Sequence, residues 1–196
     1  MDYLLPYLLG GITKVYDDIS DKEVSAHPGI VESFKSVLIA LLTMVSMDDF
    51  YFSFTCILLA LYNCGIDNPF WESIAAAAVL ITIRNISYAG DNVIFKLLLT
   101  ILGVVAFSIG AIFEDRLFPE EVSVEKIFFR VLLIIGFTVA IFLFPLLDTF
   151  PFPEFSKAPI KKGVLIMHAY ASVSVATMVY LLYYSGSSLE ELNKKK

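Results

Sequence analysis

The sequence predicts an all-α fold, a bundle of about seven transmembrane helices, from three observations. Hydrophobic residues make up 58% of the 196 residues and charged residues 17%, whereas a typical soluble domain has about 45–50% and about 25%. The hydrophobic residues gather in long runs, as a membrane-spanning helix requires. The runs lack the in-and-out alternation of a barrel strand, so helices are the expected spanning elements.

Seven apolar segments follow one another along the chain. The expected helices cover about residues 3–16, 30–47, 50–65, 71–88, 93–113, 127–147 and 161–184. A helix needs roughly 20 residues to cross the hydrocarbon core of a bilayer. The last three segments reach that length. The first and third are short, so they cross fully only if flanking residues extend them.

Breaker clusters separate the segments. Residues 64–69 and 88–92 are rich in Gly, Asn, Asp or Pro, which end helices and favour turns. Residues 148–159 hold three prolines among aromatic residues and predict an interfacial loop. Residues 189–196 read as a polar tail, so we expect one helical membrane domain over residues 1–188.

The distribution of Lys and Arg predicts the orientation, because cytoplasmic loops carry an excess of both. If all segments cross, one face carries Lys14, Lys22, Lys35, Arg116, Lys126, Arg130 and Lys194 to Lys196. The other face carries Arg84, Lys96, Lys157, Lys161 and Lys162. We therefore expect the first face, with the C-terminus, in the cytoplasm. The net charge of −6 argues against a nucleic-acid partner, because phosphate binding relies on clustered Lys and Arg. Membrane lipids are the expected surroundings.

Two acidic loops on that face resemble each other. Residues 15–25 and 112–123 each hold an aromatic residue, two adjacent acids, a spacer and Glu-Val-Ser. Four expected helices separate them, so both fall on one face. A parallel duplication with halves at about 1–90 and 91–188 gives this arrangement, and duplicated halves commonly place a site at their interface. Chance similarity between two acidic loops at the membrane edge gives it as well.

The acids of both loops predict a metal site. Residues three or four apart share one face of a helix, so several of these carboxylates can aim at one ion. Two facing carboxylate clusters repel each other unless a cation lies between them. Hard oxygen ligands suit Mg²⁺, which typically bridges carboxylates to substrate phosphates. The expected Mg²⁺ ligands are Asp17, Asp18, Asp21, Glu114, Asp115, Glu120 and Glu121.

A diphosphate would complete such a site, with its apolar half inside the bundle. Lys14, Lys35, Arg116 and Arg130 are the expected charge partners of the diphosphate, because ionised donors make the strongest bonds to phosphate oxygens. An isoprenyl diphosphate ionises when Mg²⁺ stabilises the departing diphosphate. Aromatic faces then stabilise the allylic cation away from water.

This layout resembles the UbiA superfamily of intramembrane prenyltransferases and related cyclases, over about residues 3–147. The resemblance implies an all-helical protein with two Asp-rich motifs that bind Mg²⁺ and diphosphate on one membrane face, four helices apart. It implies that Asp18 and Asp115 take part in catalysis. Asp17 stands where the family usually has Asn, and Ser25 stands where it has a further Asp.

Two other functions remain open at this point. Seven spans with parallel repeats also fit the plan of a small transporter or channel, and acids that only solvate loops fit a non-catalytic scaffold. A transporter needs a polar site near the middle of the membrane, and His168 with its polar neighbours offers one in the last segment. Hydrogen bonding between helices accounts equally for such residues.

Overall fold

The structure, a computed structural model, describes residues 3–20, 28–64, 69–119, 122–151 and 154–194. It is all-helical and has no strand within these residues, which confirms the predicted all-α class. The elements are α1 (Leu4–Ser20), α2 (Pro28–Val45), α3 (Phe50–Cys64), α4 (Pro69–Arg84), η1 (Asn85–Tyr88), α5 (Val93–Leu117), α6 (Val124–Phe142), α7 (Phe144–Thr149) and α8 (Glu154–Lys194).

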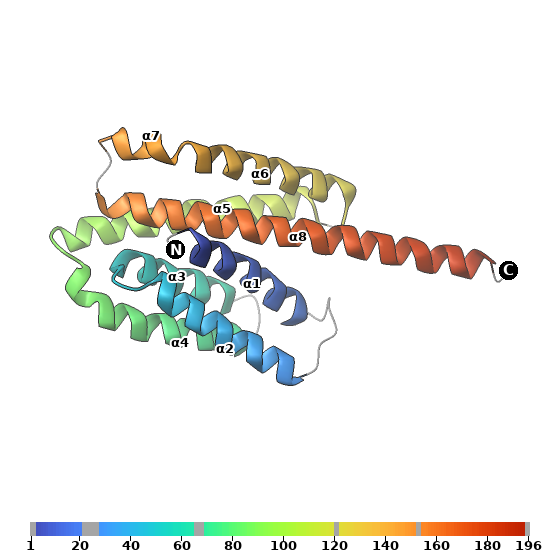
Figure 1. Cartoon of the computed structure of the whole chain (residues 1–196), viewed down its shortest axis with the longest axis horizontal. Coiled ribbons are helices and arrows are strands. Elements are labelled where there is room, and N and C mark those ends of the chain that lie inside the picture. Colours follow the sequence, from blue (N-terminus) through green and yellow to red (C-terminus); the bar gives the residue numbers. More distant parts are fainter. Residues whose placement is uncertain (1–2, 21–27, 65–68, 120–121, 152–153, 195–196) are drawn as a thin grey trace.

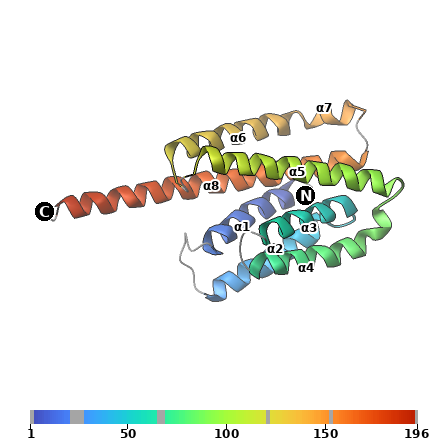
Figure 2. The same ribbon diagram turned by 180° about the vertical axis from the view of Figure 1, so that it is seen from behind.

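Each long helix runs opposite to the preceding long helix, so α1 and α8 run in the same direction (Figures 1 and 2). The ends of α1 and α5 consequently lie at one end of the bundle, together with the start of α6. The helix α8 continues through much of the predicted polar tail to Lys194 and projects well beyond the other helices (Figure 1).

Two helices are long and apolar enough to cross a membrane by length and composition, within Val93–Glu114 and Lys157–Tyr184. The helices α1 to α4 have 17, 18, 15 and 16 residues. At about 1.5 Å per residue they reach about 22–27 Å, which is short of the roughly 30 Å hydrocarbon core. Within the described residues the first four helices are therefore shorter than a full crossing, and the predicted bundle of seven transmembrane helices is not confirmed.

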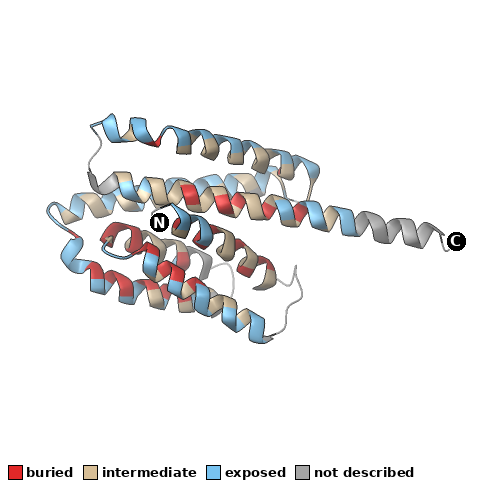
Figure 3. Cartoon of the chain, in the orientation of Figure 1, coloured by how far each residue is buried: buried red, intermediate tan, exposed pale blue. Residues whose placement is uncertain are grey.

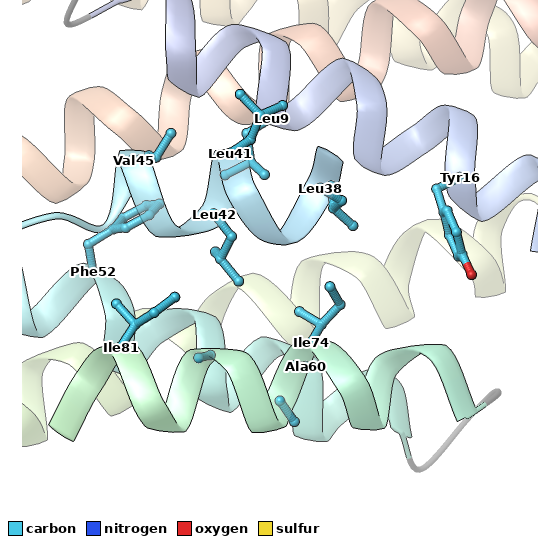
Figure 4. Close-up of a cluster of buried hydrophobic side chains, with 12 residues drawn as sticks. Leu9, Tyr16, Leu38, Leu41, Leu42, Val45, Phe52, Ala60, Ile74 and Ile81 are labelled. Carbon is cyan, nitrogen blue, oxygen red and sulfur yellow. The ribbon is translucent and has the colours of Figure 1, made fainter. Parts of the chain in front are cut away.

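The core lies between α1, α2, α3 and α4 (Figure 4). Leu38, Leu42 and Ile74 are among its buried side chains. Ala60 and Ala78 are fully enclosed and let α3 and α4 approach closely. Figure 3 shows that burial concentrates in these four helices and in the middle of α8, whereas α5, α6 and α7 are mainly exposed or half-buried. The two predicted halves thus pack differently, and the duplication stays a prediction.

Polar contacts fasten the turn between α2 and α3. The Asp49 carboxylate accepts a hydrogen bond from the Phe52 amide at 3.0 Å, which caps the start of α3. Its other oxygen lies 2.9 Å from Nζ of Lys162 on α8. The fully buried Asn85 donates from Nδ2 to the Ser46 carbonyl at 2.7 Å. This turn is therefore joined to η1, which directly follows α4, and to α8.

The helix α5 packs against α3 near its start and is otherwise open. The Tyr51 hydroxyl donates to the Ala89 carbonyl at 2.7 Å, just before α5. Further along, apolar side chains such as Ile94 and Leu102 are 78% and 63% exposed. None of the most apolar part of α5 is buried inside the protein. Such a large exposed apolar surface is typical of contact with a membrane or a partner.

The sequence predicts a loop over residues 148–159, and this prediction is wrong at its second half. The helix α7 ends at Thr149 and α8 begins at Glu154, with Pro159 inside the helix. A proline in the second turn removes one backbone hydrogen bond, and the rest of this long helix continues past it.

The helices α1 and α8 cross in backbone contact at Gly10. A Cβ atom built on Gly10 would overlap the Ile166 carbonyl oxygen and would lie 2.8 Å from the Ile166 Cα atom. On the next residue, Gly11, a Cβ would lie 3.7 Å from Val173, which is an ordinary contact. Only a residue without a side chain therefore fits at position 10.

We predict that Gly10→Ala lowers the thermal unfolding midpoint of the detergent-purified protein. The added methyl group must push α1 away from α8, and overpacking of this kind typically costs about 1–3 kcal/mol. Gly103→Ala is the matched control, because a Cβ there meets no described atom within 4 Å and Ala favours helix more than Gly. Equal midpoints for the two variants would contradict the prediction.

Candidate functional site

A pocket of about 100 Å³ lies where α1, α6 and α8 meet. Its lining residues are Lys14, Asp18, Val122, Lys126, Arg130, Ser174, Thr177, Met178 and Leu181. One water needs roughly 10–15 Å³ on this scale, so the pocket has room for a group of several heavy atoms. Three cationic side chains and one carboxylate share this lining with two hydroxyl groups.

Lys14 lies between the two adjacent carboxylates of α1. Its Nζ atom is 2.5 Å from Oδ1 of Asp18 and 3.2 Å from Oδ2 of Asp17. The spacings i,i+3 and i,i+4 place all three side chains on one helix face. Lys14 is 9% exposed and Asp18 only 2%. The Oδ1 atom of Asp18 makes no directional hydrogen bond in the described structure, so the close ion pair with Lys14 is what compensates it.

Hydroxyl groups of α8 complete the surroundings of both carboxylates. The Tyr170 hydroxyl donates to Oδ2 of Asp17 at 2.9 Å. The Thr177 hydroxyl donates to Oδ2 of Asp18 at 2.8 Å. Buried ions are tolerated only when they are paired and hydrogen-bonded. The contact between α1 and α8 meets both conditions for Asp17 and Asp18.

Arg130 connects the second acidic loop to the pocket. Its Nε atom donates to Oε1 of Glu114, at the end of α5, at 2.8 Å. Its Nη1 atom donates to the hydroxyl of Ser174, which is fully buried on α8. Asp18 of the first loop therefore lines this pocket, and Asp17 and Glu114 contact its lining cations Lys14 and Arg130.

Sequence analysis did not assign Lys126, Ser174 or Thr177 to the site. Lys126 is 7% exposed and lies one turn before Arg130 on α6. The i,i+4 spacing of Lys126 and Arg130 was the available signal, because it places two cations on one helix face. Ser174 and Thr177 are among the polar neighbours of His168 that the sequence offered for a transporter site, and the register of α8 against α1 brings them to this pocket instead.

The other predicted site residues have different positions. Lys35 is half-buried on α2 and Arg116 is exposed on α5, and neither lines the pocket. Asp21, Glu120 and Glu121 lie outside the described residues, as does the side chain of Asp115. Of the predicted residues, the structure gathers Lys14, Asp17, Asp18, Glu114 and Arg130.

The described carboxylates do not fit a Mg²⁺ site by themselves. Within the described part of the chain, no three His, Cys, Asp or Glu side chains come together as a metal-binding group. Asp17 and Asp18 are held by Lys14, and Glu114 is held by Arg130. Mg²⁺ demands several oxygen ligands in near-octahedral geometry. The Mg²⁺ site stays a prediction, and it depends on the acidic side chains that lie outside the described residues.

His168 contributes to packing between helices. Its Nε2 atom lies 3.0 Å from the Thr138 hydroxyl on α6. The Tyr7 ring of α1 lies 5.4 Å from the imidazole ring. These contacts join three helices away from the pocket lining, as expected for polar residues that hydrogen-bond across a helical bundle.

We predict that Thr177→Val destabilises the protein. The variant keeps the shape of the side chain but removes the donor to the buried Asp18, and a hydrogen bond to a charged group contributes about 1.5–3 kcal/mol. Thr100→Val is the control, because the Thr100 hydroxyl bonds only a carbonyl of its own helix in the described structure. Thermal unfolding in detergent compares the two, and an equal loss in both variants would argue against a structural role of the Thr177–Asp18 bond.

Comparison of the chain with protein-family models, curated proteins and solved structures finds no match. The resemblance to the UbiA superfamily therefore rests on the two acidic motifs and the helix pattern alone.

Proposed function

We propose that this chain is a multi-pass membrane enzyme of the prenyltransferase type, which binds an isoprenyl diphosphate in the pocket between α1, α6 and α8. One observation carries the proposal. Lys14, Lys126 and Arg130 converge on a cavity that also presents the hydroxyl of Ser174. Ammonium, guanidinium and hydroxyl groups all donate hydrogen bonds to phosphate oxygens, and the charged donors make the stronger bonds.

Two observations support a membrane location, namely the exposed apolar side chains of α5 and the 58% of hydrophobic residues in the whole chain. A helix whose apolar side chains are exposed on most sides is unstable in water, and lipid is the solvent that suits it. The first four helices cross if their flanking residues and local thinning of the bilayer make up the missing length. Seven crossings place the pocket and the C-terminus on the face that is richer in Lys and Arg, which is the cytoplasmic one.

The binding mode follows from the two kinds of lining residue. The diphosphate lies against Lys14, Lys126 and Arg130, where charge-assisted bonds hold it. Met178 and Leu181 of α8 add apolar surface to the pocket lining. The isoprenoid chain extends along this apolar side toward the bilayer. Glu114 acts as a positioning residue, because its bond to Nε fixes the Arg130 guanidinium.

The chemistry that these groups favour is ionisation of an allylic diphosphate. The bond between C1 and the bridging oxygen breaks, and the electron pair leaves with the diphosphate. The cations of the pocket stabilise the negative charge that develops on the leaving group. A nucleophilic acceptor then forms a bond to C1 and loses a proton. No step is assigned to Mg²⁺, because the described residues do not assemble a site for it.

We expect the purified protein to release diphosphate from geranylgeranyl diphosphate, and Arg130→Gln to slow the release. Loss of one donor to a developing oxyanion typically costs about 10²–10³-fold in rate. A coupled pyrophosphatase assay, run with Mg²⁺ and with EDTA, measures the release. Arg116→Gln is the matched control, because this exposed arginine does not line the pocket. Absence of release from the wild type, or equal rates in both variants, would reject the enzyme and favour a scaffold.

The membrane assignment predicts that the full chain stays in the membrane pellet after alkaline carbonate extraction. A reporter that is active only in the cytoplasm, fused after Lys196, should be active, because the Lys and Arg excess lies on that face. Release of the protein into the carbonate supernatant would contradict the membrane assignment. An inactive reporter on a membrane-retained protein would contradict the orientation alone.

A further inference from the structure

We infer that Lys14 is a built-in counter-ion of Asp17 and Asp18, and that the pocket therefore captures a diphosphate without a divalent metal. The inference rests on the proposed function, because it concerns the same pocket. It changes how the acidic motif works. The carboxylates position a cation of the protein instead of recruiting one from solution.

The Lys14 ammonium group lies where a metal ion bound to the two aspartates would have to lie. A metal site on adjacent aspartates requires a cation within reach of both carboxylates. Here the ammonium of the same helix contacts both, at 2.5 Å and 3.2 Å. The aromatic ring of Tyr170 lies 5.5 Å from this ammonium and adds a cation–π contact.

The helix α8 covers this ion cluster and supplies its remaining hydrogen bonds. Tyr170 and Thr177 donate hydrogen bonds to the two carboxylates. A metal ion would have to displace an ammonium that is tethered one turn away and is itself 9% exposed. Displacement would leave Lys14 as a buried cation without its partners, which is strongly unfavourable.

The cavity is lined by more cations than carboxylates. Lys14, Lys126 and Arg130 line it against the single carboxylate of Asp18. An anion in the cavity meets these three cations and is repelled directly by Asp18, while Asp17 and Glu114, which pair with Lys14 and Arg130, lie behind the lining. Replacing Asp18 by a neutral residue removes the repulsion from this carboxylate. It also leaves the Lys14 ammonium with one carboxylate partner fewer, so this cation interacts more strongly with the anion. The structure therefore implies that Asp18→Asn strengthens diphosphate binding, whereas a metal-bridged site requires that it weakens binding.

The test is isothermal titration of full-length, detergent-purified protein with inorganic pyrophosphate in EDTA. We expect binding without metal, about tenfold tighter binding to Asp18→Asn and about tenfold weaker binding to Lys126→Gln, from the loss of one unit charge beside the ligand. Asp91→Asn and Lys35→Gln are matched controls outside the lining and should bind like the wild type. The unfolding midpoint of each variant identifies any that fail to fold, and the Asp18 and Lys126 variants test the inference independently.

A second titration uses geranylgeranyl diphosphate in the same buffer. Binding of this lipid but not of pyrophosphate supports the inference with a lipid head group as the ligand. Binding of both supports it for free diphosphate as well. Binding that needs Mg²⁺, or that Asp18→Asn abolishes in a folded protein, overturns the inference and leaves the proposed enzyme intact. Metal-free binding without any diphosphate release rejects the enzyme and leaves the inference standing. No binding under either condition overturns both.

Discussion

The backbone contact between Gly10 and Ile166 is the constraint on which the site depends. Because position 10 has no side chain, α1 and α8 lie against each other and run in parallel. Two turns further along α1, this closeness brings Asp17 and Asp18 within hydrogen-bonding distance of Tyr170 and Thr177. A wider separation of the two helices would leave two adjacent carboxylates in an apolar bundle with one ammonium between them.

Charge compensation within the protein explains how the helical bundle accommodates these acids. Each described carboxylate near the pocket is paired with a cation, because Lys14 serves both aspartates of α1 and Arg130 serves Glu114 of α5. Removing one partner of a buried pair is costly because it strands the other. The Arg130–Glu114 pair joins α6 to α5, whereas hydrogen bonds of Tyr170, Ser174 and Thr177 join α8 to α1 and α6. The cavity lining itself combines three cations with the carboxylate of Asp18.

Local patterns made the helices and half of the site predictable. Apolar runs and breaker clusters are short-range signals, and the alternation of helix direction then places both acidic loops at one end. The register of α8 against α1 is a long-range property set by a glycine contact, so the polar neighbours of His168 were recognised as a strip, but their place beside Asp18 was not predictable. Pro159 misled the prediction, because a proline near a helix start removes a single hydrogen bond. Lys126 was used only to predict the orientation and was not included among the cations expected to bind the diphosphate.

The helix α8 is both a wall of the pocket and the longest element of the chain. Its 41 residues extend about 60 Å, roughly twice the hydrocarbon thickness. Ser174, Thr177 and Met178 stand midway along it, and the same uninterrupted helix then leaves the bundle toward Lys194. The pocket-lining part and the projecting part of α8 therefore belong to one continuous helix. A displacement of the free end would also displace Thr177, whose hydroxyl donates to Asp18.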